Sequence, residues 1–177
     1  MEKSFGVEET SFTGVHDAPP ISAAEAEDII TFLDTGATIS TRKDRPIMAN
    51  MRPAEQPIDM GTNNGVSRLD VEGDDPTAPG GKAYWTPKGI ANIDAMCALV
   101  DECKRKGDGS YVHMDTRYDD ALWRVSPADG NHLRWGRIGG LYGRKIDRAT
   151  LDYIKSLDSG LQVPSRGFLK SIPQGRF

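Results

Sequence analysis

The chain has 177 residues, a net charge of −4 and a hydrophobic share of 37%. A mildly acidic chain excludes a protein that binds nucleic acid through its overall charge. No apolar run approaches the roughly 18 residues that cross a bilayer as a helix, and residues 1–20 lack the basic cluster and apolar core of a signal peptide. With 19 glycines and 11 prolines, the composition predicts a packed core joined to irregular segments.

The first third of the chain begins with a predicted arm and a short helix. Residues 1–21 are polar and interrupted by glycine and proline, which is typical of an extended arm. Ser22 and Glu25 have the spacing of a capping box, so we expect a helix over 22–36 that ends at Gly36. Its apolar stripe would comprise Ile29, Ile30, Phe32 and Leu33.

The segment 37–82 shows no clear hydrophobic period and is predicted to be irregular. Five prolines interrupt it, and it contains two glycine-rich turn sequences. A run of this length without secondary structure is unusual inside a compact domain. We therefore expect it to be a linker or an extended arm that another molecule holds.

A small core is predicted at 83–160. Thr86 and Pro87 carry the signals of a helix start, apolar residues then recur at helical spacing, and Gly107 ends the helix. Both cysteines, Cys97 and Cys103, fall in this helix, where six residues separate their Cα atoms by roughly 9 Å, too far for a disulfide. Reduced thiols suit a reducing compartment such as the cytoplasm, and the expected location of the chain is the cytoplasm or an assembled particle.

Three strands and a second helix complete the predicted core. Strands are expected at 110–114, 121–125 and 132–138, the last two joined by the turn 126–131. Asp147 can cap a final helix that ends at Gly160. The predicted fold class is α+β, a small core of two helices and a short antiparallel sheet, with long extended N-terminal, central and C-terminal arms.

The tail 161–177 returns to proline and glycine and is predicted to be a second terminal arm. Sparse apolar side chains in both arms could anchor them on neighbouring molecules. These candidate anchors are Phe5, Phe12, Phe168, Leu169 and Phe177.

The segment 133–148 alternates basic and aromatic residues and contains four glycines. Cations neutralise phosphates and aromatic rings stack on bases, so this composition suits nucleic acid. Trp135-Gly136-Arg137 resembles the signature of WGR domains, which implies binding to DNA ends, and Gly140-Leu141-Tyr142-Gly143 resembles the GxxG loop of KH domains. The structural alternative is a hairpin edge with packed rings. The candidate contact residues are Arg134, Trp135, Arg137, Tyr142, Arg144, Lys145 and Arg148.

Two further segments carry groups that could act in catalysis. Asp34-Thr35-Gly36 resembles the loop of retroviral-type aspartic proteases, which implies that two copies would share a proton between their Asp34 carboxylates. A helix end explains the same residues. His113 lies near three aspartates, a set that could bind a metal or transfer protons, although a solvated loop between strands is the simpler interpretation.

These observations favour a non-enzymatic assembly component, with the arms joining neighbouring subunits, as in a virus or bacteriophage capsid, connector or tail. Other copies of the chain or other subunits would be its partners. The alternative hypothesis is a nucleic-acid-binding module that uses the segment 133–148. We expect no catalytic residue, no cofactor, no metal and no membrane contact.

Overall fold

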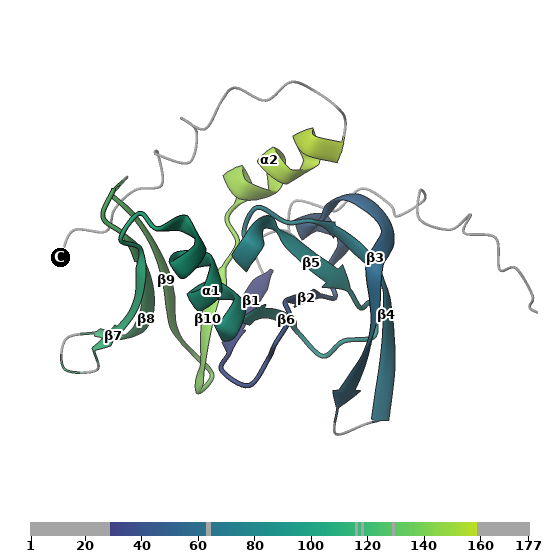
Figure 1. The fold of residues 1–177 in the computed structure, drawn as a ribbon, viewed down its shortest axis with the longest axis horizontal. Helices are drawn as coiled ribbons and strands as arrows, with labels where there is room; N and C mark the ends of the chain where they lie inside the picture. Colours follow the sequence, from purple (N-terminus) through teal and green to yellow (C-terminus); the bar gives the residue numbers. More distant parts are fainter. Residues whose placement is uncertain (1–28, 63–64, 116, 118, 129, 159–177) are drawn as a thin grey trace, which may run out of the picture.

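The computed structural model describes residues 29–62, 65–115, 117, 119–128 and 130–158 (Figure 1). Within these residues the strands are β1 (Ile30–Asp34), β2 (Thr41–Arg42), β3 (Ala49–Thr62), β4 (Gly65–Asp74), β5 (Lys82–Trp85), β6 (Asn92–Ala95), β7 (Tyr111–Asp115), β8 (Asp119–Ser126), β9 (Asn131–Ile138) and β10 (Leu141–Lys145). The helices are α1 (Met96–Lys106) and α2 (Arg148–Asp158), with short 3-10 turns η2 (Arg45–Ile47) and η3 (Pro79–Gly81).

The ten strands form one mixed sheet in the order β3-β4-β5-β2-β6-β1-β10-β9-β8-β7. Strand β6 lies near the middle, parallel to β1 and antiparallel to β2. On one side of it, the long hairpin β3–β4 extends away from the body (Figure 1). On the other side, β7, β8, β9 and β10 form an antiparallel meander whose last strand pairs with β1. The sheet therefore has two wings that meet at β6.

Each helix covers a different part of the sheet. Helix α1 packs on one face of the meander, in a cluster that contains Leu33, Leu99, Leu122 and Trp135. It ends at Gly107, which has a left-handed φ of 60°, after a last turn of three basic residues. Helix α2 packs against η2 and β3. None of the described helices is long and apolar enough to cross a membrane.

The predicted small core with a short antiparallel sheet is wrong, because the described residues form one large mixed sheet. The predicted irregular segment 37–82 contains β2, β3, β4 and the start of β5. The prolines of this segment were the reason for predicting no strand there. Pro53 and Pro57 lie in β3, one of the two edge strands of the sheet, where register shifts interrupt the ladder. A missing N–H on the outer side of an edge strand removes no ladder hydrogen bond.

Two predicted helices are also corrected. The described part of 22–36 contains the strand β1, and the helix expected from Thr86 begins only at Met96, after β6. Strands β1 and β6 pair with each other, so tertiary pairing overrides the local helix signals. The three strands predicted at 110–114, 121–125 and 132–138 are confirmed within two residues at each end.

The final helix is confirmed as α2, and the Asp147 carboxylate accepts the Thr150 N–H at 2.7 Å as the expected cap. The predicted arms 1–21 and 161–177 lie outside the described residues.

Candidate functional site

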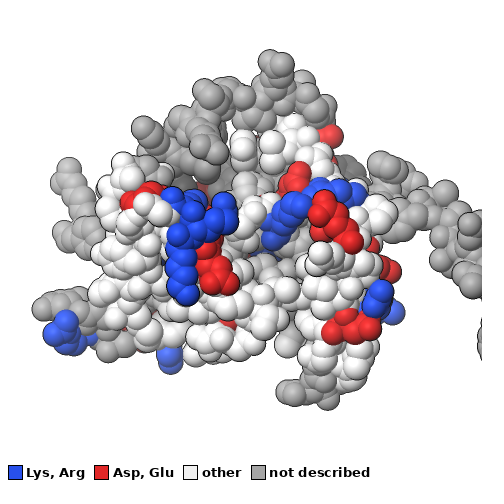
Figure 2. All heavy atoms as spheres, in the orientation of Figure 1, with Lys and Arg blue, Asp and Glu red and all other residues white. Residues whose placement is uncertain are grey.

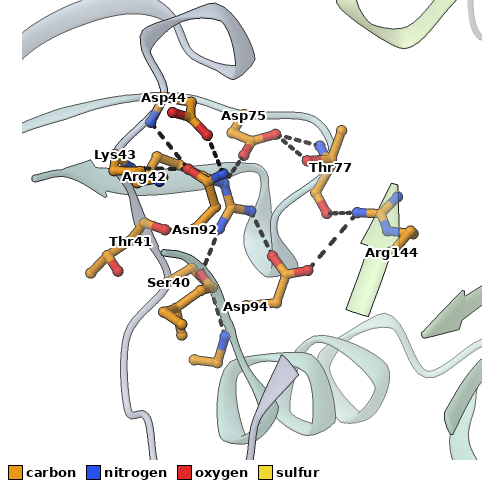
Figure 3. Close-up of polar contacts among 12 residues, drawn as sticks. Ser40, Thr41, Arg42, Lys43, Asp44, Asp75, Thr77, Asn92, Asp94 and Arg144 are labelled. Atoms are coloured by element: carbon orange, nitrogen blue, oxygen red, sulfur yellow. Dashed lines mark hydrogen bonds and ion pairs between the residues drawn. The ribbon is translucent and has the colours of Figure 1, made fainter. Parts of the chain in front are cut away.

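A buried ion cluster lies where the two wings meet (Figure 3). Its centre is the Arg42 side chain from β2, which is 0% exposed. The Arg42 Nε donates to the Asp75 carboxylate at 2.5 Å and Nη2 donates to Asp94 at 2.6 Å. Nη1 donates to the carbonyl oxygens of Ile93 and Thr41. One guanidinium thus joins β2, β6 and the chain that follows β4.

Residues from the meander complete this cluster. The second Asp94 oxygen accepts the Trp135 indole N–H at 3.0 Å and lies 4.0 Å from Arg144 Nη2. Arg144 also donates to the Thr77 carbonyl at 3.0 Å, and its guanidinium carbon lies 5.4 Å from the Trp135 ring centroid. Two arginines therefore face two aspartates, and their formal charges cancel inside the protein.

Burial and ion pairing act in opposite directions on the two arginines. Burial lowers the pKa of Arg42, but its two carboxylate partners outweigh burial and raise that pKa above its ordinary value. At Arg144 burial dominates and lowers the pKa. Arginine remains protonated in proteins in either case. Because Asp75 and Asp94 are fully buried, this cluster holds strands together and offers no carboxylate to a substrate.

The face of the meander opposite α1 carries an unusual set of side chains. Side chains that point to one side of a sheet alternate along each strand and share that side with their cross-strand partners. The α1 cluster takes Leu122 and Trp135, so the alternate residues face the other way. We call this second surface the open sheet face. It comprises Ile30, Phe32, Tyr111, His113, Trp123, Val125, His132, Arg134, Ile138, Leu141 and Lys145.

Two glycines leave room for side chains of the open sheet face. A Cβ atom on Gly143 would lie 3.1 Å from Phe32 Cδ1 and 3.1 Å from Ile138 Cδ1. A Cβ on Gly136 would lie 2.5 Å from Arg134 Nη1. The Arg134 side chain donates to the Asp119 carboxylate at 2.8 and 3.0 Å. A side chain at either glycine would therefore come into close contact with members of the open sheet face.

The open sheet face is apolar for a surface that faces solvent. Tyr111 is 49% exposed and Leu141 is 59% exposed, while Ile30, Phe32 and the other apolar members are partly buried. Both described helices make their core contacts elsewhere, α1 on the opposite face and α2 against η2 and β3. The solvent side of an antiparallel sheet is usually polar, and exposed apolar patches mark contact surfaces.

The structure does not gather the predicted nucleic-acid residues on one surface. Arg134 and Lys145 lie on the open sheet face, whereas Trp135 is fully buried on the other side and cannot stack on a base. The remaining members make contacts within the protein: Arg137 with Asp120, Tyr142 with Asp120, Arg144 with Thr77, and Arg148 with Asp152. Figure 2 shows most Lys and Arg atoms of one face beside Asp and Glu atoms.

The other sequence candidates are dispersed as well. Asp34 ends β1 and is exposed, and its carboxylate accepts the Gly36 N–H at 2.8 Å. His113 lies on the open sheet face with its ring 6.4 Å from that of Tyr111, edge to face. The residues compared with a KH loop form the β9–β10 turn and β10, where Gly139 and Gly140 adopt left-handed φ angles of 58° and 92°. The candidate anchors Phe5, Phe12, Phe168, Leu169 and Phe177 lie outside the described residues.

Sequence reasoning missed the ion cluster and the open sheet face. Arg42 lies in a charged run, which is typical of a solvated segment. Strand β8 did carry a signal, because Ala121, Leu122, Trp123 and Val125 place apolar side chains on both of its faces. Comparisons with protein-family models, curated proteins and solved structures found no match. A function for the chain therefore rests on its own geometry.

Proposed function

We propose that the chain is a non-enzymatic building block of a large protein assembly, of the kind that forms the capsid, connector or tail of a virus or bacteriophage particle. Copies of the chain contact one another through the open sheet face. The observation that carries this proposal is the side of the meander that presents Phe32, Tyr111, Trp123 and Leu141 without a described helix over it.

The energetics favour a partner on this surface. Fully burying one large apolar side chain contributes about 1.5–3 kcal/mol. Tyr111 and Leu141 are each about half exposed, so covering both supplies about 1.5–3 kcal/mol in total to an interface. The strands beneath the surface are also joined to the rest of the sheet by the buried ion cluster, so we expect the surface to be ordered before a partner docks. A partner that docks there loses little free energy in ordering the surface.

Introducing negative charge at the exposed apolar members of this surface tests the proposal. In sedimentation velocity at matched concentrations, the wild-type chain is expected to sediment as an oligomer. A Leu141→Glu and Tyr111→Glu double variant is expected to sediment as a folded monomer, with an unchanged circular dichroism spectrum. The matched control is Ile90→Glu, because Ile90 is 90% exposed in the connection between β5 and β6, outside the open sheet face.

Two results would overturn the proposal. One is a wild-type chain that stays monomeric at all concentrations. The other is an oligomer that the two glutamate substitutions together leave intact. A monomeric chain that binds a single-stranded oligonucleotide, with affinity falling steeply as salt rises, would favour the nucleic-acid hypothesis instead. In that case replacing Arg134 and Lys145, the two candidate cations on the open sheet face, should weaken binding.

A further inference from the structure

The surface that receives a neighbouring copy also indicates which part of that copy it takes. We propose that residues 1–28 of one copy lie across the open sheet face of the next copy, with Phe5 and Phe12 as the apolar anchors. This inference rests on the proposed function, and it names the contact through which the copies join.

The area of the face favours a segment over a second flat face. The five strands β1, β10, β9, β8 and β7 span about 19 Å across at the usual strand spacing, and seven residues along β9 span about 20 Å. The footprint is then about 400 Å², roughly half of the ~800 Å² per partner in a stable interface. If two copies of this face packed directly on each other, each partner would bury only about half of the area of a stable interface. A segment of 28 residues continues beyond the face and adds contacts along its length.

Chain connectivity favours the N-terminal segment over the C-terminal one. Residues 1–28 lead directly into β1, whose Ile30 and Phe32 belong to the open sheet face. The C-terminal segment leaves from the end of α2, which packs against η2 and β3 in the other wing. Fully extended, 28 residues reach roughly 90 Å, so the segment is long enough to pass from its own β1 to a neighbouring molecule.

The sequence of the N-terminal segment matches the dimensions of the surface. Ser4-Phe5-Gly6-Val7 and Ser11-Phe12-Thr13-Gly14-Val15 are two versions of one short pattern. Their phenylalanines are seven residues apart, a reach of about 23 Å in an extended chain against ~19 Å between β1 and β7. An odd spacing turns the two rings to opposite sides of a regular strand, so both can contact the face only if the chain departs from a regular strand between them, which Gly6 permits.

Charge points to the same segment. Residues 1–28 contain seven acidic residues and one lysine, whereas residues 159–177 contain three basic residues and no acidic one. The open sheet face carries Lys145, which is exposed and makes no ion pair with the described residues. Arg134 is already paired with Asp119. The acidic segment is therefore the one that can pair with Lys145.

Photo-crosslinking between copies of the full chain tests the assignment directly. A chain with Phe12→p-benzoylphenylalanine is mixed with an equal amount of ¹⁵N-labelled wild-type chain, irradiated and digested. Mass spectrometry is expected to find mixed-isotope crosslinks from position 12 to peptides of β7, β8, β9 and β10. The comparison chain carries Phe168→p-benzoylphenylalanine and is expected to give no crosslinks to those peptides. Crosslinks from position 12 only within one copy, or only to other surfaces, would overturn the assignment.

A second measurement separates this inference from the proposed function. The Phe5→Ser and Phe12→Ser double variant is expected to raise the apparent Kd of self-association at least tenfold, since each substitution removes a buried aromatic ring. If the Leu141→Glu and Tyr111→Glu variant dissociates the oligomer while the phenylalanine variant does not, the segment assignment fails and the proposed function stands. If the wild-type chain is monomeric, the proposed function fails and the segment assignment fails with it.

Discussion

Replacing Arg42 with methionine removes the cation that bridges Asp75 and Asp94. Both carboxylates are fully buried, and each then lacks a hydrogen bond of 2.5–2.6 Å. Removing one partner of a buried ion pair costs about 3–5 kcal/mol, because the remaining charge is left uncompensated. Arg144 remains 4.0 Å from Asp94 and offsets part of the loss there. We therefore expect Arg42→Met to lower the free energy of unfolding by about 4 kcal/mol.

Urea unfolding followed by tryptophan fluorescence measures this loss, with buried Trp135, which donates to the same Asp94 as Arg42, as a reporter. The matched control is Arg68→Met, because Arg68 pairs with Asp59 at 2.9 Å on the exposed hairpin. Its expected loss is at most about 1 kcal/mol. Arg42→Lys keeps the positive charge but lacks the forked guanidinium geometry. Its loss of unfolding free energy should lie between the losses of Arg42→Met and Arg68→Met. A loss below about 1 kcal/mol for Arg42→Met would refute the reasoning about buried charge.

Two further outcomes follow from the structure. Burial raises the pKa of Glu102, but the Lys106 ammonium and other partners outweigh burial, so this pKa lies below its ordinary value. A carboxyl group whose pKa is lower in the folded state stabilises the fold at pH values above its ordinary pKa. This stabilisation is lost as the pH falls through the pKa of the folded state. Glu102→Gln should therefore shift the urea midpoint more at about pH 7 than at about pH 3; equal shifts would contradict this. Gly73→Ala places its Cβ 2.9 Å from a backbone carbonyl oxygen and should cost about 1–3 kcal/mol. The Cβ of Gly136→Ala meets only the flexible end of the Arg134 side chain, so this variant should lose less unfolding free energy than Gly73→Ala in the urea assay. A larger loss for Gly136→Ala would contradict the packing argument.

Local chemistry made part of the fold predictable. The end of α1 at Gly107, the Asp147 cap of α2 and the turn between β8 and β9 each depend on a few consecutive residues, and the sequence shows them. The strand β3 was not predictable in this way. Its prolines argue against a strand in isolation, and only its place at the edge of the sheet makes them compatible with pairing.

The ion cluster was not predictable because its members are neighbours only after the sheet forms. Arg42 and Asp94 are 52 positions apart, and they meet because β2 pairs with β6. A single sequence shows each as an ordinary charged residue, which is normally exposed. The open sheet face was partly predictable, since β8 has apolar residues at consecutive positions. The position of α1 decides which face of β8 is covered. No local sequence pattern specifies that position.

The sequence separations within the ion cluster have a kinetic consequence. Its contacts join residues 33, 41, 52 and 67 positions apart. Closing such loops loses chain entropy before the contacts repay it, which slows folding. During synthesis, Arg42 leaves the ribosome long before Asp94, Trp135 and Arg144. Until Arg144 is synthesised, Asp75 and Asp94 have only one arginine beside them, so the cluster cannot be completed before the ribosome has passed β10.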